Sequence, residues 1–539
     1  MIRENIGPDA MNKKLERVHA FVILFLLWIG IYLPGLGTLE FKGEEGRRVL
    51  PAVEMLRTGN WIVPQVGGEP YWKKPPFINW LVAVSFALTG EQCELSARFP
   101  SALFVLGFAS VLVLMRSPWQ DLSGRLMGSI IFMTSIGLIE KGRLIEIEAV
   151  YICLTGMAIL WWLNAWACGS SAWSLWGVPS LILACSLLTK GPVSLLLFYI
   201  TVVCVLVYHR RIKALTCAGH VFGVLLMLGV FCGWSYLAAQ QSGWNSMTDQ
   251  VSGEMFSRIR PRGFNFFEWV GHVLTSLAYL LPWLPAVGLI WRKKYTSNIQ
   301  QEYLPLFKGC RLSLVLGFVL IVLMPGMHPR YTMPVLGLAS VLLGWILWVG
   351  GDFRECARIW RAALIIGFLV SCVTATVVFV GFSARIWGLV VCAATICVTI
   401  LVLSEIDRFR TPLVLSILTA ILIVTLVLQY GLVAAAIGER YEKRRPLAAS
   451  INQIIPKEET LYVYKPGYQA FLFYIRPPLE YIVTSDQIDQ KVSYLLLKED
   501  AFEELVKSSD FSSRLAKTLY EFSYRHKGDM RLVELRQSQ

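Results

Sequence analysis

The sequence predicts an all-α polytopic membrane protein that carries a small soluble α/β domain at its C-terminal end. Of the 539 residues, 55% are hydrophobic and only 16% are charged, whereas soluble domains typically carry about 25% charged residues. Long apolar runs fill the chain up to Val433, and most of the charge follows that residue or lies in short loops. Because every backbone polar group in lipid must pair internally, these runs are expected to be helices.

A helix needs about 20 apolar residues to cross the hydrocarbon core, and on that measure we expect about thirteen spans within residues 1–436. The segment 77–88 is shorter and is expected to be an interfacial helix. The expected spans are 18–37, 97–115, 126–138, 149–166, 175–188, 193–208, 217–238, 270–291, 312–324, 331–349, 362–382, 386–403 and 413–433.

Basic residues gather in alternate loops, which sets the orientation. Under the positive-inside rule, the loops 209–213, 292–294, 354–361 and 408–410 lie in the cytoplasm together with the N-terminus. The long first loop, 38–96, and the C-terminal domain, 437–539, then lie outside. Basic loops beside anionic lipid headgroups also account for the net charge of +13. No basic patch is interleaved with aromatics, so nucleic acid is not an expected partner.

The region 437–539 has the pattern of a small α/β domain. Strands are expected at 460–464, 481–484 and 492–497, a helix at 501–507, and a terminal hairpin from 519–524 and 530–535. This region carries no catalytic signature.

The first loop contains the sequence FKGEEGRR. Glu44 and Glu45 stand beside Arg47 and Arg48, and neighbouring guanidiniums favour the ionised form that a general base needs. A solvated charged turn would have the same composition, and the motif alone does not decide between the two.

Further basic residues stand next to rigid turns. Lys73 and Lys74 precede two prolines that stiffen the chain, and Lys190 precedes a Gly-Pro break. Such lysines could hold a lipid phosphate, anchor the chain to headgroups, or cap a helix C-terminus.

Ionisable residues also open a span and follow later ones. Arg143, Glu146 and Glu148 lie at the outer end of the span 149–166, where the helix dipole favours carboxylates and where an ionisable group suggests function. Later external segments add Arg258 and its neighbours Arg260 and Arg262, and then His328 and Arg330. Cations on the side that the positive-inside rule disfavours indicate a phosphate site rather than an anchor.

Taken together, these motifs resemble those of the ArnT/PMT-like C-type (GT-C) glycosyltransferases, and most closely the bacterial aminoarabinose-transferase branch. The resemblance runs through most of the chain. The matching motifs are Glu44-Glu45-Gly46-Arg47 with Glu for the family's Asp, Lys74-Pro75-Pro76, Arg143 followed by Glu148 in place of Asp, Thr189-Lys190-Gly191-Pro192, and the turn from His328 to Pro334.

The resemblance implies an inverting membrane glycosyltransferase with a polyprenyl-phosphate sugar as donor, undecaprenyl phosphate being the bacterial carrier. The acceptor would be a lipid, glycan or protein, as in lipid A modification of lipopolysaccharide. The enzyme would act at the outer face of the bacterial inner membrane, with its N-terminus cytoplasmic and its C-terminus periplasmic. Membrane lipids would be its surroundings.

The resemblance also implies roles for individual residues. Glu44 is the expected catalytic base and Glu148 the second candidate. If the acceptor is a phosphate, Glu44 would only orient it. The expected donor-phosphate ligands are Lys74, Lys190, Arg258 and Arg330, and the expected supporting residues are Glu45, Arg47, Arg143, His328 and Tyr331.

No cofactor is assigned from the sequence. Lys73 stands where aminoarabinose transferases often carry an acidic residue. The resemblance therefore supports no metal site there and leaves the identity of the sugar open.

The alternative function is a transporter or flippase for lipid-linked sugars. Such a protein needs ionisable groups or broken helices near the middle of the membrane. The expected spans hold few ionisable groups, and the charges gather at one edge instead. This distribution favours an interfacial enzyme, and it also distinguishes the chain from a purely structural or assembly protein.

Overall fold

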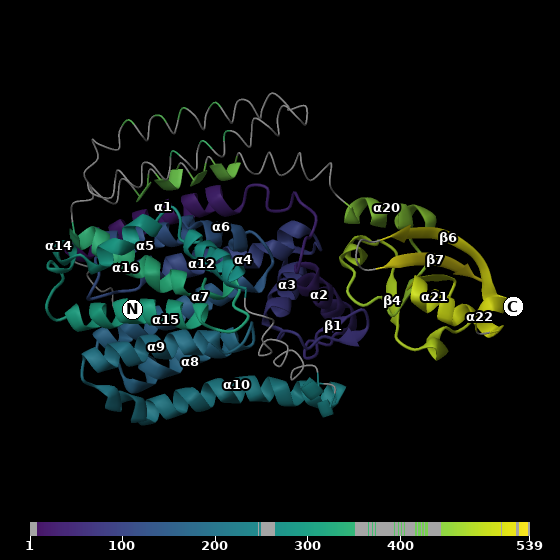
Figure 1. The fold of residues 1–539 in the computed structure, drawn as a ribbon, viewed down its shortest axis with the longest axis horizontal. Coiled ribbons are helices and arrows are strands. Elements are labelled where there is room, and N and C mark those ends of the chain that lie inside the picture. The colour runs from purple at the N-terminus through teal and green to yellow at the C-terminus, as the bar shows by residue number, and fades with distance from the viewer. Residues whose placement is uncertain are drawn as a thin grey trace, which may run out of the picture.

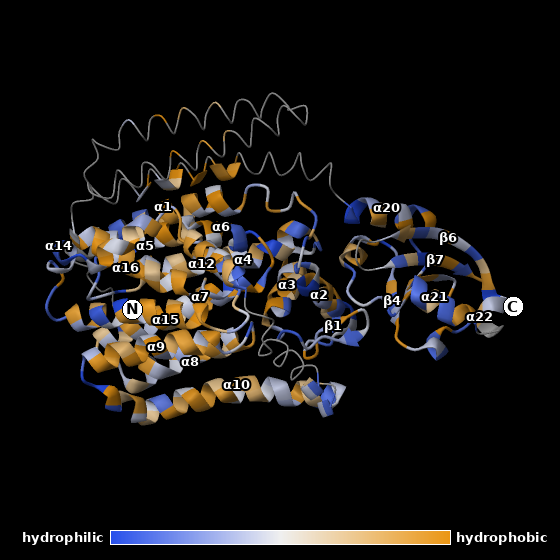
Figure 2. Cartoon of the chain, viewed as in Figure 1, coloured by the Kyte–Doolittle hydropathy of each residue, from blue (hydrophilic) through white to orange (hydrophobic). Residues whose placement is uncertain are grey.

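The computed structural model describes residues 8–245, 247–249, 265–350, 443–507, 509–523 and 528–536, with isolated helical positions between 365 and 428. Figure 1 shows two parts, a large bundle of helices and a smaller sheet domain that lies against one end of it. Hydrophobic residues dominate the helices of the bundle, whereas the sheet domain is mixed in hydropathy (Figure 2).

The described helices of the bundle are separated mostly by short connections. Their bounds are α1 Pro8–Tyr32, α2 Gly46–Thr58, α3 Phe77–Thr89, α4 Glu94–Leu114, α5 Leu122–Thr134, α6 Ile136–Gly142, α7 Ile147–Ala167, α8 Ala172–Leu187, α9 Val193–Tyr208, α10 Ala218–Ser242, α12 Phe266–Ala278, α13 Leu284–Val287, α14 Lys293–Thr296, α15 Leu304–Val322 and α16 Val335–Gly350.

Within the described residues, four helices are long and apolar enough to cross a membrane: α4, α7, α10 and α15. A fifth span results if α5 and α6, which meet at 65°, count as one. The helices α8, α9 and α16 are apolar but shorter. About thirteen spans were expected, and that number is not confirmed. The expected spans 362–382, 386–403 and 413–433 lie outside the continuously described residues.

The expected spans 126–138 and 270–291 are broken rather than continuous. Helix α12 ends at Ala278, and the following residues include Pro282 and Pro285, which cannot donate the backbone hydrogen bonds of a helix. Helix α5 ends at Thr134, and the amides of Ile136 and Gly137 donate across to the carbonyls of Leu281 and Tyr279. The two breaks therefore satisfy each other's backbone groups.

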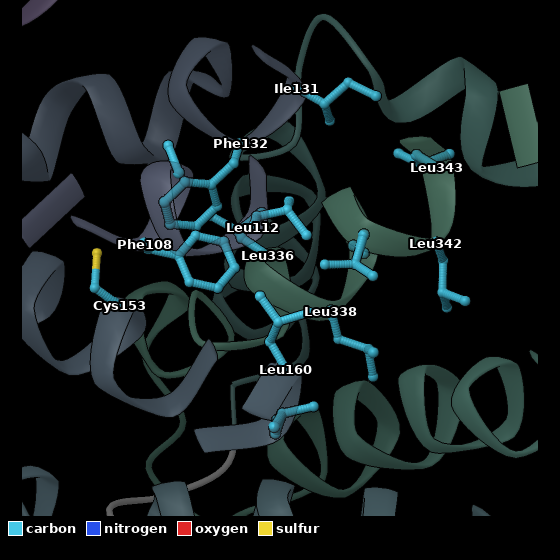
Figure 3. Packing of buried hydrophobic residues seen from close by; sticks show 14 of the residues in the cluster. Phe108, Leu112, Ile131, Phe132, Cys153, Leu160, Leu336, Leu338, Leu342 and Leu343 are labelled. Carbon is cyan, nitrogen blue, oxygen red and sulfur yellow. The ribbon is translucent and has the colours of Figure 1, made fainter. Parts of the chain in front are cut away.

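The core of the bundle lies between α4, α5, α7 and α16 (Figure 3). Phe108 and Phe132 face each other there, with their ring centroids 4.3 Å apart. Small residues let the backbones approach closely: a Cβ on Gly344 of α16 would lie 2.5 Å from the backbone nitrogen of Gly128 of α5. Such contacts between small residues are a common way for apolar helices to pack.

The first loop folds over one end of this bundle. It contains α2, a short hairpin of β1 (Gln65–Val66) and β2 (Glu69–Pro70), and α3. The expected interfacial helix 77–88 corresponds to α3. Its neighbour α2 packs on α3 through a separate hydrophobic cluster that includes Val49, Ile78 and Val82.

The C-terminal region contains a five-stranded sheet of order β4-β3-β5-β7-β6. The strands are β3 Leu461–Tyr464, β4 Leu479–Ile482, β5 Tyr494–Lys498, β6 Leu515–Ser523 and β7 Asp529–Leu535, with helices α20 Arg444–Ile454, α21 Glu499–Val506 and α22 Ser509–Arg514. Strand β3 pairs in parallel with both β4 and β5, while β7 is antiparallel to β5 and β6. The predicted small α/β region with a terminal hairpin is confirmed.

Candidate active site

A polar pocket of about 200 Å³ opens where four segments of the chain meet. The segments are the first loop, the start of α7, the turn after α8, and the short 3₁₀ helix η3 (Pro329–Tyr331). The pocket is lined by Glu44, Arg47, Arg48, Tyr71, Lys73, Lys74, Glu146, Ile147, Glu148, Lys190, Arg330 and Tyr331. The structure thus brings Glu44, Lys74, Glu148, Lys190 and Arg330 together, although they are far apart in sequence.

A buried carboxylate that lines this pocket pairs with two cations. Glu148 stands in the first turn of α7, where the helix dipole favours negative charge. One of its carboxylate oxygens is 3.2 Å from the ammonium nitrogen of Lys190 and 3.7 Å from Nε of Arg330. Its side chain is only 7% exposed, so the charge is compensated mainly by these partners rather than by bulk water.

Aromatic rings complete the surroundings of Lys190. Its ammonium lies 5.0 Å from the ring centroid of Tyr331 and 5.4 Å from that of Tyr151, distances at which an aromatic face attracts a cation. The lysine follows the end of α8 and precedes Gly191, whose φ of 137° suits glycine. The Gly-Pro break thus turns the chain so that the lysine faces the pocket.

Glu44 also lines the pocket and lies just before α2. Both of its carboxylate oxygens accept hydrogen bonds from Nη1 of Arg47, at 2.8 and 2.9 Å. Arg48 approaches the same carboxylate at 3.9 Å and donates to the Tyr71 hydroxyl at 3.3 Å. The Glu44 side chain is 41% exposed, so a ligand in the pocket can reach it.

The neighbouring Glu45 has a different environment and does not line the pocket. Its side chain is fully buried, and Arg98 of α4 donates to both of its oxygens at 2.7 and 2.9 Å. It also accepts the amides of Lys42 and Ile145, at 2.9 and 3.1 Å. Glu45 therefore ties the first loop to α4 and to the segment that leads into α7.

A lysine that pairs with two carboxylates lies just before α7. The Lys141 ammonium lies 2.9 Å from Glu146 and 3.0 Å from Glu140. Burial raises the pKa of the Glu146 carboxyl, and nearby Glu148 adds to that rise, while Lys141 opposes it. Burial thus disfavours the charged form of Glu146, and Lys141 offsets part of that effect.

Other predicted site residues lie elsewhere. Arg143 donates to the carbonyls of Ile31 and Pro34 at the end of α1 and does not line the pocket. His328 is exposed, with its ring centroid 5.6 Å from those of Tyr331 and His272. Arg258 lies outside the residues that the structure describes, as do Arg260 and Arg262.

Tyr71 was not among the predicted site residues, although it lines the pocket. It lies two residues before Lys73 in the same loop, and a tyrosine beside a lysine pair at the membrane surface could have indicated it. Within the described part of the chain, no group of three or more His, Cys, Asp or Glu side chains could hold a metal ion.

A family model described as dolichyl-phosphate-mannose-protein mannosyltransferase (PMT) matches residues 43–246. This stretch includes Glu44, Lys74, Glu148 and Lys190, and ends before Arg330.

Curated relatives extend the similarity. The undecaprenyl phosphate-alpha-4-amino-4-deoxy-L-arabinose arabinosyl transferase of Shewanella sediminis is 27% identical over 354 residues, which cover 61% of this chain and 60% of that protein. The protein of the same name from Edwardsiella ictaluri is 25% identical over 370 residues, covering 64% and 62%. The chain thus spans about three fifths of the length of these relatives.

The fold is similar to that of ArnT from Cupriavidus metallidurans, whose crystal structure was solved with undecaprenyl phosphate bound. The TM-score is 0.68 at 18% identity, covering 96% of this chain and 97% of that one. The family match, the curated relatives and this shared fold agree with the motifs of the sequence, which resemble those of the ArnT/PMT-like C-type glycosyltransferases.

Proposed function

We propose that this protein is an integral membrane glycosyltransferase that moves a sugar from a polyprenyl-phosphate donor to a lipid or glycan acceptor. The observation that carries the proposal is the composition of the polar pocket, which six basic and three acidic side chains line. An excess of cations in one pocket suits an anionic group such as a lipid phosphate.

The donor phosphate is assigned to Lys74, Lys190 and Arg330, with Arg258 as a further ligand from sequence. When the bond between sugar and phosphate breaks, the leaving phosphate gains negative charge. Cations fixed around it stabilise this transition state more than the bound donor, which is the requirement for catalysis. Glu148 holds Lys190 and Arg330 in place before the donor arrives.

An apolar pocket next to the phosphate site supports a lipid donor. Residues of α12, α15 and α16, and of the segments that follow α12 and precede α16, line a space of about 200 Å³. Among them are Leu280, Phe318 and Met333. Thr332 and Met333, which line it, directly follow Arg330 and Tyr331 of the polar pocket. A polyprenyl chain lying there would bury apolar surface while its phosphate reached the cations.

Glu44 is proposed as the general base, because its carboxylate is reachable whereas Glu148 is buried against Lys190. Glu44 takes the proton of an acceptor hydroxyl, and the freed oxygen attacks the anomeric carbon. The bond from that carbon to the phosphate oxygen breaks with inversion, and its electron pair leaves with the polyprenyl phosphate. With a phosphate acceptor, no proton needs to be removed and Glu44 would orient the acceptor.

The proposal also covers location and acceptor. We place the pocket at the outer face of the bacterial inner membrane, with a transmembrane domain of residues 1–436 and a periplasmic domain of 437–539. The basic loops 209–213 and 292–294 support a cytoplasmic N-terminus. The arabinosyl-transferase relatives support undecaprenyl phosphate as the lipid carrier, and the lipid A of lipopolysaccharide is the proposed acceptor class.

Incubating the purified full-length protein with a panel of polyprenyl-phosphate sugars and a lipid acceptor, and measuring released polyprenyl phosphate, tests the proposal. We expect release with at least one donor, and release about 10²–10⁴-fold slower from the Glu44→Gln variant. Movement of labelled donor across liposomes without release would instead indicate a flippase.

A further inference from the structure

The C-terminal domain contacts the catalytic loop directly. Tyr468 lies between β3 and the 3₁₀ helix η4 (Ala470–Tyr474), and its hydroxyl donates to the carbonyl of Gly43 at 2.9 Å. The face of its ring lies against the Arg47 guanidinium, with Cζ 4.7 Å from the centroid. A residue of the sheet domain thus contacts a residue that lines the polar pocket.

The fit at this contact is close. A Cβ on Gly46, at the start of α2, would lie 2.7 Å from the Tyr468 hydroxyl oxygen and 3.0 Å from the Cβ of Ala470. A side chain at position 46 would overlap these atoms. The segment 468–470 therefore packs directly against the first turn of α2. That turn immediately follows Glu44 and Glu45.

The contacts continue from Tyr468 into the pocket. Its ring faces Arg47, and Arg47 in turn donates to both carboxylate oxygens of Glu44. A flexible arginine that is held by an aromatic face loses less freedom when it pairs, because its orientation is already restricted. The ring therefore helps to fix the carboxylate that is proposed as the base.

Other contacts hold the domain in place without Tyr468. The Tyr474 hydroxyl donates to Glu94 and accepts from the Phe41 amide, both at 2.8 Å. Arg445 donates to Glu94 at 2.5 Å, and Arg444 pairs with Glu40 at 3.0 Å. Removing the Tyr468 ring should therefore leave the domain docked.

We propose that Tyr468 is a positioning residue for Glu44, acting through Arg47, so that the C-terminal domain completes the active site. The inference rests on the proposed glycosyltransferase function. It assigns the domain a part in orienting the base rather than a separate binding task.

The test uses the full-length protein in lipid nanodiscs, with polyprenyl-phosphate release as the assay. Tyr468→Leu removes the ring and the hydroxyl, Tyr468→Phe removes only the hydroxyl, and Tyr520→Leu makes the same change in the same domain away from the first loop. Because Glu44 is then oriented less well, we expect a kcat about tenfold lower for Tyr468→Leu, which corresponds to ~1.4 kcal/mol of transition-state stabilisation. We expect its donor KM and melting temperature to stay unchanged, with Tyr468→Phe and Tyr520→Leu close to wild type.

A double variant then tests whether Tyr468 acts through Arg47. If it does, Tyr468→Leu combined with Arg47→Gln loses no more activity than Arg47→Gln alone, because residues that act as one unit are not additive. Multiplied losses would overturn the inference, as would an unchanged kcat in Tyr468→Leu or an equal loss in Tyr468→Phe. If the wild-type protein itself releases no polyprenyl phosphate, the proposed function fails and the inference falls with it.

Discussion

The Lys190 ammonium lies 3.2 Å from the carboxylate of Glu148, and this pair joins the turn after α8 to the first turn of α7. The two side chains are 12% and 7% exposed, so neither charge is well solvated by water. Removing one member of a buried pair leaves the other uncompensated, which typically costs about 3–5 kcal/mol. The pair therefore supports both the stability of the pocket and its charge.

Lys190→Met should weaken donor-lipid binding and destabilise the protein by about 3 kcal/mol, since it leaves Glu148 buried without the cation that lies 3.2 Å from it. Thermal unfolding in detergent and a binding titration with polyprenyl phosphate measure the two effects. Lys73→Met is the matched control for stability, because Lys73 is exposed and surface charges contribute little. Equal melting temperatures for the two variants would show that the pair does not stabilise the fold.

Glu44→Gln should lower kcat about 10²–10⁴-fold, the usual contribution of a general base, and leave donor binding intact. Glu44→Asp should keep partial activity, because it retains the carboxylate but withdraws it by one methylene from Arg47. Steady-state kinetics of polyprenyl-phosphate release separate these cases. Wild-type turnover by Glu44→Gln would remove Glu44 from the mechanism.

Glu45→Gln should act on stability, in contrast to the adjacent Glu44→Gln. Glu45 is fully buried and meets Arg98 through two hydrogen bonds, so its replacement leaves a buried guanidinium without its charge partner. We expect a loss of about 3–5 kcal/mol in the free energy of unfolding, and a much smaller one for Glu44→Gln at its exposed position. Similar unfolding curves for the two variants would contradict this division.

Glu94→Gln should loosen the C-terminal domain. Its carboxylate accepts from both Arg445 and Tyr474, and a neutral amide weakens the first of these contacts most. Hydrogen exchange in α20 should become faster, since local opening depends on the contacts that hold a segment. Unchanged exchange there would mean that the domain is held by other contacts alone.

The sequence predicted the parts of the fold that depend on local patterns. Apolar runs indicated the helices, and alternating residues indicated the strands of the C-terminal sheet. The predicted topology also placed several polar clusters on the same side of the membrane, because the basic loops identify the opposite side as cytoplasmic. This is why the sequence could group Glu44, Lys74, Glu148 and Arg330.

Features that depend on distant partners were not predicted. The role of Glu45 requires Arg98, which lies 53 residues away in sequence. The break after Thr134 requires acceptors at Tyr279 and Leu281. Arg143 matched a motif, but its actual partners are carbonyls at the end of α1, and no spacing rule identifies them.

The central claim is that the cations of the polar pocket receive a lipid phosphate. A cryo-electron microscopy structure of the protein in nanodiscs with bound polyprenyl phosphate tests it most directly. The account predicts phosphate density within hydrogen-bonding distance of Lys190 and Arg330, with the lipid chain leading toward Met333. Phosphate density outside the pocket that Glu44 and Glu148 line would contradict it.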